Sequence, residues 1–399
     1  MKKILFLLTQ DLASPSGLGR YFPIAKYLVE QGYQAEIGAL HSDYENLSVR
    51  DVVVEGVNVH YVSQMHVRKS HNKTQYFSSG ALIKVAHQAA WRLLGLVVRS
   101  KPDLIFIGKP HPMNSFAGLV GGWLIRKPVI VDCDDYEAVS NRFSSQWQYK
   151  IVRHFENSVP KSAKHVTTNT YFNLERMAAL GIPRTKISYL PNGVDQDRFE
   201  NLDPEKLVQL REHLTLGGCK VVAYIGSLSL ANHPVDLLLE SFRRIAASNG
   251  QVKLLIVGGG ADLDNLKAQA VALGIDERTV FCGRVDSDQV PYYYQLADVT
   301  VDPVNETEAA KGRCPLKMFE SWMAGIPFVT ADVGDRRILA GEPAAALLAV
   351  PGDSQDLAEK INSILNDDRL KAKLQSTGLE QVKEYTWKAI VTRNLAVFS

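Results

Sequence analysis

Short runs of apolar and β-branched residues alternate with longer runs of helical periodicity along the whole chain. In the first half we expect strands at residues 3–8, 34–40, 57–62, 103–108, 128–132, 165–168 and 187–190, and helices at 19–31, 79–99, 114–125, 144–158 and 170–180. In the second half we expect strands at 221–226, 253–257, 280–283, 298–301 and 327–330, and helices at 235–247, 263–273, 289–296, 316–324, 356–366 and 371–383. This alternation predicts parallel sheets with helices on both faces, because the strands are apolar along nearly their whole length.

Two such sets of elements predict an α/β protein with two doubly wound, Rossmann-like domains, and 399 residues suffice for both. We expect an N-terminal domain at 1–192 and a C-terminal domain at 193–375. The helices of 376–399 are expected to pack back toward the N-terminal domain. Ligands of open α/β sheets bind beyond the carboxyl ends of the strands, so the default site is a cleft between the two domains.

The composition is that of an ordinary globular chain, with 46% hydrophobic and 22% charged residues. It excludes a disordered, collagen-like or disulfide-stapled protein. No apolar run approaches the roughly 20 residues of a membrane-spanning helix, and the apolar stretch 4–8 is shorter than a signal-peptide core. The four cysteines lack the CxxC spacing of a zinc ribbon or redox pair, so we expect free thiols in a cytoplasmic protein.

The net charge of +2 hides a basic front half and an acidic back half. Residues 1–190 carry 23 basic and 14 acidic side chains, whereas the remainder carries 22 and 29. No acidic residue occurs between Gly56 and Pro102, a stretch that contains Arg68, Lys69, Lys73, Lys84, Arg92, Arg99 and Lys101. A basic face of this kind attracts an anionic membrane surface or a phosphate-bearing acceptor. Nucleic acid is not expected, because no recognition motif accompanies these basic residues.

Apolar residues at helical spacing follow within this basic stretch, namely Leu82, Val85, Ala89, Leu93 and Leu96. We interpret them either as a face for peripheral membrane contact or as the core-facing side of a helix with a solvated basic face. The two readings carry equal weight at this stage.

Gly17-Leu18-Gly19-Arg20 follows the first expected strand. Gly17 and Gly19 allow a ligand to approach the backbone closely, and the helix that begins there offers free N–H groups to an anion. A plain strand-to-helix turn explains the same residues equally well. A dinucleotide fingerprint is disfavoured, because the sixth position of the motif is Phe22 rather than glycine.

Three carboxylates, Asp132, Asp134 and Asp135, lie at the end of the strand 128–132. At the carboxyl edge of a sheet they are suited to orienting an acceptor or sugar hydroxyl, or to holding a metal. Helix capping and solvated charge form the alternative. We favour a functional role for Asp134 and Asp135 because of their position.

The strongest motif is Lys-Gly-Arg-Cys-Pro-Leu-Lys-Met-Phe-Glu at residues 311–320. Pro315 suits the first position of a helix, whose free N–H groups would form an anion site together with Lys311, Arg313 and Lys317. Glu320 lies three residues after Lys317 and shares its helix face. The arrangement predicts a diphosphate at the start of the helix and a carboxylate on a ribose diol. A surface ion pair is the alternative.

Residues 316–330, Leu-Lys-Met-Phe-Glu-Ser-Trp-Met-Ala-Gly-Ile-Pro-Phe-Val-Thr, resemble the donor-binding segment of the family 4 glycosyltransferases with the GT-B fold. Further stretches look like the same family in the same order, at 17–20, 190–195, 223–226, 255–260, 281–285, 297–298 and 333–335. The resemblance implies two Rossmann-like domains that face each other across a cleft. It also implies sugar transfer from a nucleotide diphosphate sugar, UDP- or GDP-linked, with retention and with no metal or other cofactor.

The resemblance further implies roles for individual residues. Glu320 would bind the ribose hydroxyls, and the backbone at Leu316, Lys317 and the Gly17–Gly19 loop would hold the diphosphate. Gly283, Arg284 and Val285 would face the base. Donor binding would lie in the acidic second half and acceptor binding in the basic first half, where the acceptor is a glycan, a lipid-linked sugar or a small molecule.

Four positions depart from the family's pattern. Ser227 and Asn232 stand where the family often has an arginine and a lysine, so Arg313, Lys311 and Lys317 are the candidate substitutes. Gly312 stands where the first of two paired glutamates is usual, which leaves Glu306 or Glu308 for the sugar. The histidine often found after the strand 128–132 is replaced by Asp134 or Asp135.

The sequence is therefore compatible with three functions. A retaining hexosyltransferase is the function that the resemblance favours, and the absence of an evident nucleophile agrees with it, because cations and helix N–H groups stabilise the leaving group. The departures at Ser227, Asn232 and Gly312 motivate a nucleotide-sugar-binding protein with weak catalysis. A nucleotide-sugar epimerase of the same fold would convert the donor without an acceptor.

Overall fold

The computed structural model describes residues 1–12, 17–70, 73–141, 143 and 145–399, and the chain divides into two compact units. The first unit comprises Met1–Gly193 together with Trp387–Ser399, and the second comprises Val194–Thr386. The chain thus returns to the first unit for its last thirteen residues. Of the expected C-terminal segment 376–399, residues 376–386 belong to the second unit and residues 387–399 to the first.

The first unit is built on an eight-stranded sheet in the order β10-β9-β8-β7-β1-β2-β4-β3. Neighbouring strands are parallel except for the edge pair β3 and β4. The strands are β1 Lys3–Leu7, β2 Gln34–His41, β3 Asp51–Val54, β4 Val57–Gln64, β7 Leu104–Gly108, β8 Val129–Cys133, β9 His165–Thr168 and β10 Ile187–Tyr189, and a separate antiparallel hairpin is formed by β5 Val67–Ser70 and β6 Lys73–Tyr76.

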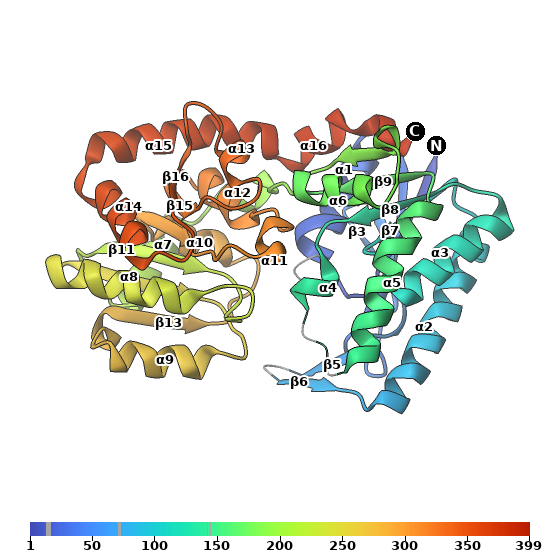
Figure 1. Ribbon diagram of the computed structural model, residues 1–399, viewed down its shortest axis with the longest axis horizontal. Coiled ribbons are helices and arrows are strands. Elements are labelled where there is room, and N and C mark those ends of the chain that lie inside the picture. The colour runs from blue at the N-terminus through green and yellow to red at the C-terminus, as the bar shows by residue number, and fades with distance from the viewer. Residues whose placement is uncertain (13–16, 71–72, 142, 144) are drawn as a thin grey trace. The chain divides into compact units, whose positions relative to one another are not determined.

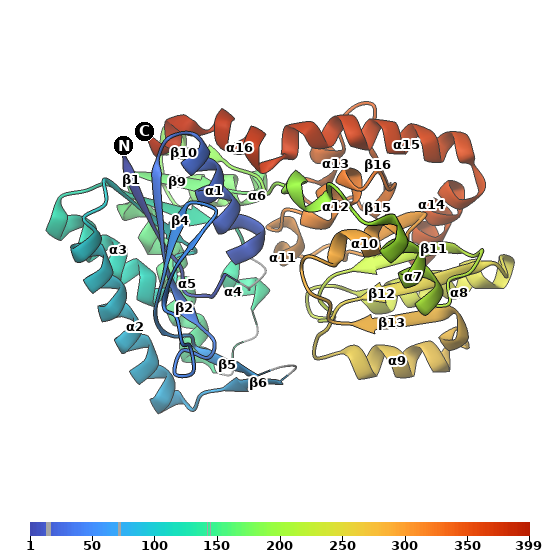
Figure 2. The ribbon, with the colours of Figure 1, turned by 180° about the vertical axis from the view of Figure 1, so that it is seen from behind.

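Helices cover both faces of this sheet (Figures 1 and 2). Alternate residues of β1 point to opposite sides: Leu5 and Leu7 pack in one apolar core with α2, α3 and α5, and Ile4 and Phe6 pack in the other with α1 and α16. The helices of the unit are α1 Phe22–Glu30, α2 Ser79–Ser100, α3 Pro112–Ile125, α4 Glu137–Ser140, α5 Gln146–Ser162, α6 Tyr171–Ala179 and α16 Trp387–Arg393.

The apolar stripe of 79–99 had two readings, a face for peripheral membrane contact or the core-facing side of the helix. Ala89, Leu93 and Leu96 of α2 are buried in the apolar core that α2 forms with α3 and the sheet, and Leu82 and Val85 are half-buried. The core-facing reading holds for the three buried residues, and peripheral membrane contact stays a prediction. Residues 71 and 72 of the basic stretch lie outside the described residues.

The second unit contains a six-stranded parallel sheet in the order β13-β12-β11-β14-β15-β16. Val222 and Tyr224 of β11 pack toward α8 and α14, and Val221 and Ala223 pack toward α7 and α10. The strands are β11 Lys220–Ile225, β12 Val252–Val257, β13 Thr279–Gly283, β14 Val299–Asp302, β15 Phe328–Ala331 and β16 Ala346–Ala349, and the helices are α7 Pro204–His213, α8 Val235–Ser248, α9 Leu263–Ala272, α10 Val290–Gln295, α11 Glu308–Lys311, α12 Leu316–Met323, α13 Arg336–Ala340, α14 Ser354–Asn366 and α15 Asp368–Gln381.

Each sheet has one point at which the direction of strand order reverses. In the first unit this point lies between β1 and β7, and in the second it lies between β11 and β14. The loops that leave adjacent strands there diverge to opposite faces and open a crevice at the carboxyl edge of the sheet. Both groups of polar residues described below lie at these two points.

Candidate active site

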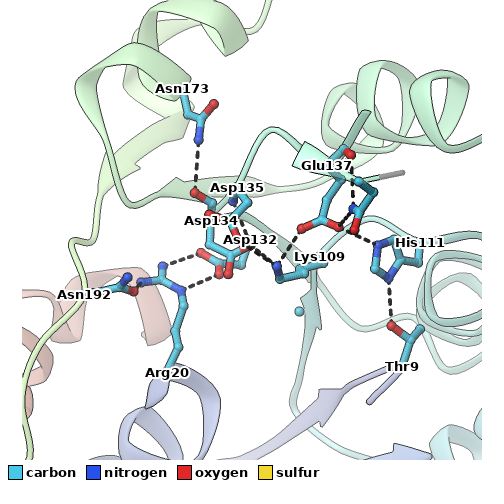
Figure 3. A network of polar contacts seen from close by, with 12 residues as sticks. Thr9, Arg20, Lys109, His111, Asp132, Asp134, Asp135, Glu137, Asn173 and Asn192 are labelled. Carbon is cyan, nitrogen blue, oxygen red and sulfur yellow. Dashed lines mark hydrogen bonds and ion pairs between the residues drawn. The ribbon is translucent and has the colours of Figure 1, made fainter. Parts of the chain in front are cut away.

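Polar side chains from three loops gather at the carboxyl edge of the first sheet (Figure 3). Thr9 follows β1, Lys109 and His111 follow β7, and the acidic residues Asp134 and Asp135 follow β8. These three strands are neighbours, so residues up to 126 positions apart in the sequence meet at one edge. The cluster lies where an open α/β sheet places its ligand site.

Lys109 is the centre of this cluster. Its Nζ lies 2.6 Å from Glu137 Oε1, 2.9 Å from Asp135 Oδ2 and 3.6 Å from Asp134 Oδ1, and its side chain is buried. The backbone of Lys109 has a φ of 60°, in the left-handed region that residues with a Cβ seldom adopt. Strained backbone of this kind is concentrated at functional sites.

The carboxyl groups around Lys109 differ in their proton affinity. Burial raises the pKa of Asp134 well above its ordinary value, and the nearby charges of Asp135 and Asp132 add to this although Lys109 opposes it. Burial also acts on Glu137, but Lys109 and His111 outweigh it and hold the pKa of Glu137 well below its ordinary value. The cluster thus combines a firmly ionised carboxylate with a carboxyl that holds its proton more readily.

The three carboxylates Asp134, Asp135 and Glu137 each place one oxygen within 4.8 Å of the others, a spacing that a metal ion could use. The ammonium group of Lys109 already contacts all three. The ammonium group of Lys109 therefore balances the negative charge of these carboxylates, as a bound metal ion would.

His111 connects the cluster to the first strand. Its Nδ1 lies 2.7 Å from Thr9 Oγ1 and its Nε2 lies 3.3 Å from Glu137 Oε2. Asn141 Nδ2 also donates to Glu137 Oε2, at 2.6 Å. The side chains of His111 and Asp135 are 20% and 27% exposed, so they are the members of the cluster that an entering molecule would meet first.

The turn at Gly17–Tyr21 is π-helical and leads into α1. Its Arg20 forms a buried bidentate pair with Asp132, with Nε–Oδ2 and Nη2–Oδ1 distances of 2.7 Å, and also donates to Leu190 O and Asn192 Oδ1. Arg20 therefore anchors this turn to Asp132 of β8 and to residues 190–192. A diphosphate contact from Gly17 and Gly19 stays a prediction.

In the second unit the start of α12 is the focus. Pro315 is its N-cap, and the first helical residues are Leu316 and Lys317. Lys317 Nζ lies 2.9 Å from Asp302 Oδ1 at the end of β14, and Arg336 Nη2 lies 3.2 Å from the other carboxylate oxygen. Although burial opposes it, these two cations hold the pKa of Asp302 well below its ordinary value.

The imidazole of His233 is half-buried, and the cations Lys317 and Arg313 lie near it. Burial lowers its pKa well below the ordinary value, and the charges of Lys317 and Arg313 lower it further. Lys317 Nζ lies 3.5 Å from His233 Nδ1. The positive charge at this helix start is thus concentrated on Lys317, Arg313 and Arg336 while His233 stays neutral.

Arg313 contacts Asn232, the residue that stands where the family often has a lysine. Its Nη1 donates to the carbonyl oxygen of Asn232 at 2.8 Å, and its Nη2 donates to Asn232 Oδ1 at 3.2 Å. Lys311 instead pairs with Glu306 at 2.8 Å, in an exposed ion pair. Of the candidate substitutes, Arg313 and Lys317 are therefore the two that converge on the loop after β11, which begins at Gly226 and Ser227.

Glu320 is buried and held at both oxygens. Arg198 Nη1 lies 3.1 Å from its Oε1, and the Tyr294 hydroxyl donates to its Oε2 at 3.0 Å. Arg198 also donates to the carbonyl oxygen of Ser287, so this carboxylate is fixed in direction. Each carboxylate oxygen has two lone pairs, which leaves acceptor capacity for further hydroxyl groups.

Close packing against a side chain at Gly226 and against backbone at Gly258 explains two glycines of this edge. A Cβ on Gly226 would lie 2.4 Å from Lys317 Cε, and a Cβ on Gly258 would lie 1.8 Å from Gly226 O. By contrast, Gly283 (φ 69°) has no atom within 4 Å of such a Cβ. Gly283 ends β13, two strands away from β11, and Arg284 and Val285 follow it; the contact of this segment with a base stays a prediction.

Several residues of these clusters were not predicted as site residues from the sequence. Lys109 and His111 stand in Lys-Pro-His-Pro directly after an apolar strand, which is a position that signals a ligand loop. Asp302 likewise directly follows the expected strand 298–301. No local pattern points to the others, because their partners are distant in the sequence: Glu137, Arg198, His233, Tyr294 and Arg336.

Comparisons with known proteins agree with this architecture. Residues 16–193 match the family described as Glycosyl transferase 4-like domain, and residues 219–367 match the family described as Glycosyl transferases group 1. Each match falls on one α/β unit.

Among curated relatives, mannosylfructose-phosphate synthase of Agrobacterium fabrum is 26% identical over 66% of this chain and 59% of its own length. A GDP-mannose-dependent α-(1-6)-phosphatidylinositol monomannoside mannosyltransferase of Mycobacterium tuberculosis is 27% identical over 57% of this chain and 60% of its own length. The matched regions thus span about 60% of these relatives.

Among solved structures, Anabaena Alr3699/HepE in complex with UDP and glucose superposes with a TM-score of 0.73 at 20% identity, covering 99% of this chain and 98% of that chain. Sucrose-phosphate synthase from Thermosynechococcus elongatus gives a TM-score of 0.78 at 17% identity, covering 100% and 98%. These likenesses establish the fold.

Proposed function

Because the chain belongs to the family 4 glycosyltransferases with the GT-B fold, we propose that it transfers a sugar from a nucleotide diphosphate sugar to an acceptor hydroxyl. One observation carries this proposal: Lys317 and Glu320 lie on one face at the start of α12, at the reversal point of the second sheet. The buried Asp302 holds Lys317, and the buried Tyr294 together with Arg198 holds Glu320. The helix start suits a diphosphate, and the fixed carboxylate suits a ribose diol.

The donor would bind in the second unit. The backbone N–H groups of Leu316 and Lys317 are free of partners within the helix and would meet the diphosphate. Arg313, which sits on Asn232, would supply charge that the family's lysine normally supplies. Ser227 is exposed at the end of β11, where it would offer a hydroxyl and an N–H group.

During transfer the bond between the anomeric carbon and the leaving phosphate oxygen breaks, and a bond to the acceptor oxygen forms. Negative charge grows on the diphosphate, so Lys317, Arg313 and the helix N–H groups would stabilise the transition state. We propose that the departing phosphate oxygen receives the acceptor's proton and that configuration is retained. No protein nucleophile is then required.

The acceptor would bind in the first unit at the cluster around Lys109. Asp135 and His111 are the accessible members, and Asp134 can hold a proton because burial raises its pKa. These groups would orient the acceptor hydroxyl. We propose that transfer needs no metal or other cofactor, since Lys109 balances the three carboxylates, and turnover that survives a metal chelator would support this.

We propose a UDP- or GDP-linked donor and a glycan or lipid-linked acceptor. The printed names of similar proteins support this choice, because one structure holds UDP and glucose and one relative is a GDP-mannose-dependent mannosyltransferase of a phosphatidylinositol mannoside. A cytoplasmic location with peripheral membrane contact is part of the same proposal.

Release of nucleotide from a panel of UDP- and GDP-sugars, measured with and without acceptor mixtures, tests the function. We expect release that depends on acceptor, and a fall of about 10²-fold or more in Lys317→Ala. Lys311→Ala is the matched control, because that exposed lysine pairs only with Glu306 among the contacts described, and it should change the rate little. Tight nucleotide binding without any product would instead indicate a binding protein, and donor conversion without acceptor would indicate an epimerase.

A further inference from the structure

A cavity of about 750 Å³ lies between helix α2 and the strands β3 and β4 of the first unit. We call it the α2–β4 cavity. Residues 91–99 of α2 form one wall, and residues of the loop after β2, of the start of β3 and of β4 form the rest. Pockets that hold small molecules have volumes of roughly 300–1,000 Å³, so this cavity has room for a ligand.

Three arginines line the α2–β4 cavity, and none of them has an acidic partner among the described residues. The guanidinium carbons of Arg50 and Arg92 lie 4.4 and 5.4 Å from the ring centroid of Tyr44. Arg92 Nη1 also donates to the carbonyl oxygen of Val62 at 3.2 Å. The third, Arg99, lies about two turns further along α2 on the same side of the helix. The three guanidinium groups therefore keep donors for an anion.

The charge of the α2–β4 cavity is positive. Asp51 is the one carboxylate among its lining residues that the structure describes, and its Oδ1 lies 2.6 Å from His60 Nδ1. The sequence of α2 contains no acidic residue. Guanidinium groups stay charged at every physiological pH and pair with carboxylates and phosphates through two parallel hydrogen bonds. The cavity therefore suits a ligand that carries one of these two groups.

Aromatic side chains give the same cavity flat apolar surfaces. Trp91 is 54% exposed, and its ring is positioned by an edge contact with Phe116, at 5.6 Å between the ring centroids. Tyr61 is positioned in the same way by His41, at 5.1 Å. A sugar ring matches such a lining, because its C–H groups pack on an aromatic face while its polar groups bond to charged donors.

Tyr61 connects the α2–β4 cavity to the candidate acceptor site. It is hydrogen-bonded to the backbone of Leu12, in the loop that follows β1. Thr9 of the same loop contacts His111, which belongs to the cluster around Lys109. One loop is therefore shared by the cavity and by that cluster.

We propose that the α2–β4 cavity binds the carboxylate or phosphate group of an acidic saccharide and thereby selects an acidic glycan as the acceptor. The sugar ring lies on Trp91, and its acidic group lies between the three arginines. The selection of an acceptor rests on the proposed sugar transfer, whereas the binding of an acidic sugar does not. No side chain of this site belongs to the cluster around Lys109 or to the start of α12.

Titration of the full-length protein with glucuronate and with glucose, followed by tryptophan fluorescence, tests the binding. The two sugars differ in one carboxylate, so glucuronate should bind about tenfold more tightly or better, and the difference should shrink at high salt. Glucose 6-phosphate and glucose give the same comparison for a phosphate group. Trp91→Phe should remove the fluorescence change, which locates the bound sugar at the cavity.

The variant Arg50→Gln/Arg99→Gln removes two exposed guanidinium groups and should weaken glucuronate binding by about tenfold or more. The matched control is Lys150→Gln/Arg153→Gln, which removes two exposed cations of α5, one of them also placed on a tyrosine ring. It should leave the binding unchanged. In transfer to an acidic acceptor, the first variant should raise KM and keep kcat, because these arginines hold the acceptor away from the reacting atoms.

Glucuronate binding without any sugar transfer would uphold the acidic-saccharide site and refute only the proposed function. Equal binding of glucose and glucuronate, or glucuronate binding that Arg50→Gln/Arg99→Gln retains, would overturn the proposal. Inorganic phosphate that binds as tightly as glucose 6-phosphate would also overturn it, because the site would then recognise charge without the sugar. Equal kcat/KM for acidic and neutral acceptors would refute the selection of the acceptor.

Discussion

Lys109 combines two features that are each costly for a lysine. Its ammonium group is buried, and its backbone adopts the left-handed conformation. Burial alone would lower the pKa of Lys109, but Asp134, Asp135 and Glu137 raise it well above the ordinary value. The lysine therefore stays charged, and the three acids in turn depend on it.

Replacing Lys109 with methionine should destabilise the first unit by about 3–5 kcal/mol, because the carboxylates would lose their buried partner. Chemical denaturation followed by circular dichroism measures this loss. Lys127→Met is the control, since its ion pair with Asp103 is well exposed and should contribute less than about 1 kcal/mol. Equal effects of the two variants would contradict the central role of Lys109.

His233 should make the second unit sensitive to acid. Its pKa in the folded protein lies well below the ordinary value of 6.5, so the unfolded chain takes up the proton first as the pH falls. Stability contributed by neutral His233 is therefore present above pH 6.5 and is lost as the pH falls through the lower folded pKa.

Urea denaturation between pH 7 and pH 5 measures this dependence. The free energy of unfolding should fall less steeply in His233→Gln than in the unchanged protein. The exposed His87 offers a control, and His87→Gln should keep the original slope. An unchanged slope in His233→Gln would contradict the assignment.

At the scale of elements, periodicity and apolar runs were sufficient for the buried parallel strands and the long helices. These patterns did not predict the short strands and helices whose stability comes from pairing with a neighbouring strand or from a capping residue. The edge strand β3 is mostly exposed and is stabilised by pairing with β4, and β16 lies at an edge of the second sheet, where it pairs with β15. Helix α7 has no buried residue and begins at the Asp203 cap rather than at an apolar pattern.

The faces of α2 show a second limit of sequence reasoning. Apolar residues occur on both sides of this helix, so spacing alone could not decide which side meets the core. Contacts with α3 and the sheet decide it: Leu93 and Leu96 are buried, whereas Trp91 and Val98 remain at the surface.

The turn after β12 gives a prediction at this scale. Gly258 has a φ of 146°, and its added Cβ would approach Gly226 O to 1.8 Å, so Gly258→Ala should cost more than about 2 kcal/mol of stability. Gly250→Ala meets no atom within 4 Å and should stay within about 0.5 kcal/mol. Thermal unfolding compares the two, and a mild Gly258→Ala would show that the turn can relax.

At the scale of the whole molecule, the opposite charges of the two halves of the sequence correspond to the two units. The sequence reasoning predicted the fold class correctly, and the family matches confirm the resemblance. Of the candidate residues, Lys317 and Glu320 were selected from their spacing on one helix, and their contact with a donor stays a prediction. The ion network of Lys109 and the Asp302 pair could not be found in this way, because their members meet only when separate loops reach the same sheet edge.

The expectation that the two domains face each other across a cleft stays a prediction, as do the individual roles of the site residues. The account depends most on where the donor binds. The two Rossmann-like units offer two sheet edges with comparable geometry, and only the second has a helix start that combines Lys317, Arg313 and a fixed Glu320.

A crystal structure of the protein with bound UDP or GDP tests this claim most directly. The nucleotide that raises the melting temperature more would be chosen for crystallisation. We predict the diphosphate at the N–H groups of Leu316 and Lys317, with Arg313 beside it and the ribose hydroxyls on Glu320. A nucleotide bound at the Lys109 cluster, or anywhere away from the start of α12, would contradict the account.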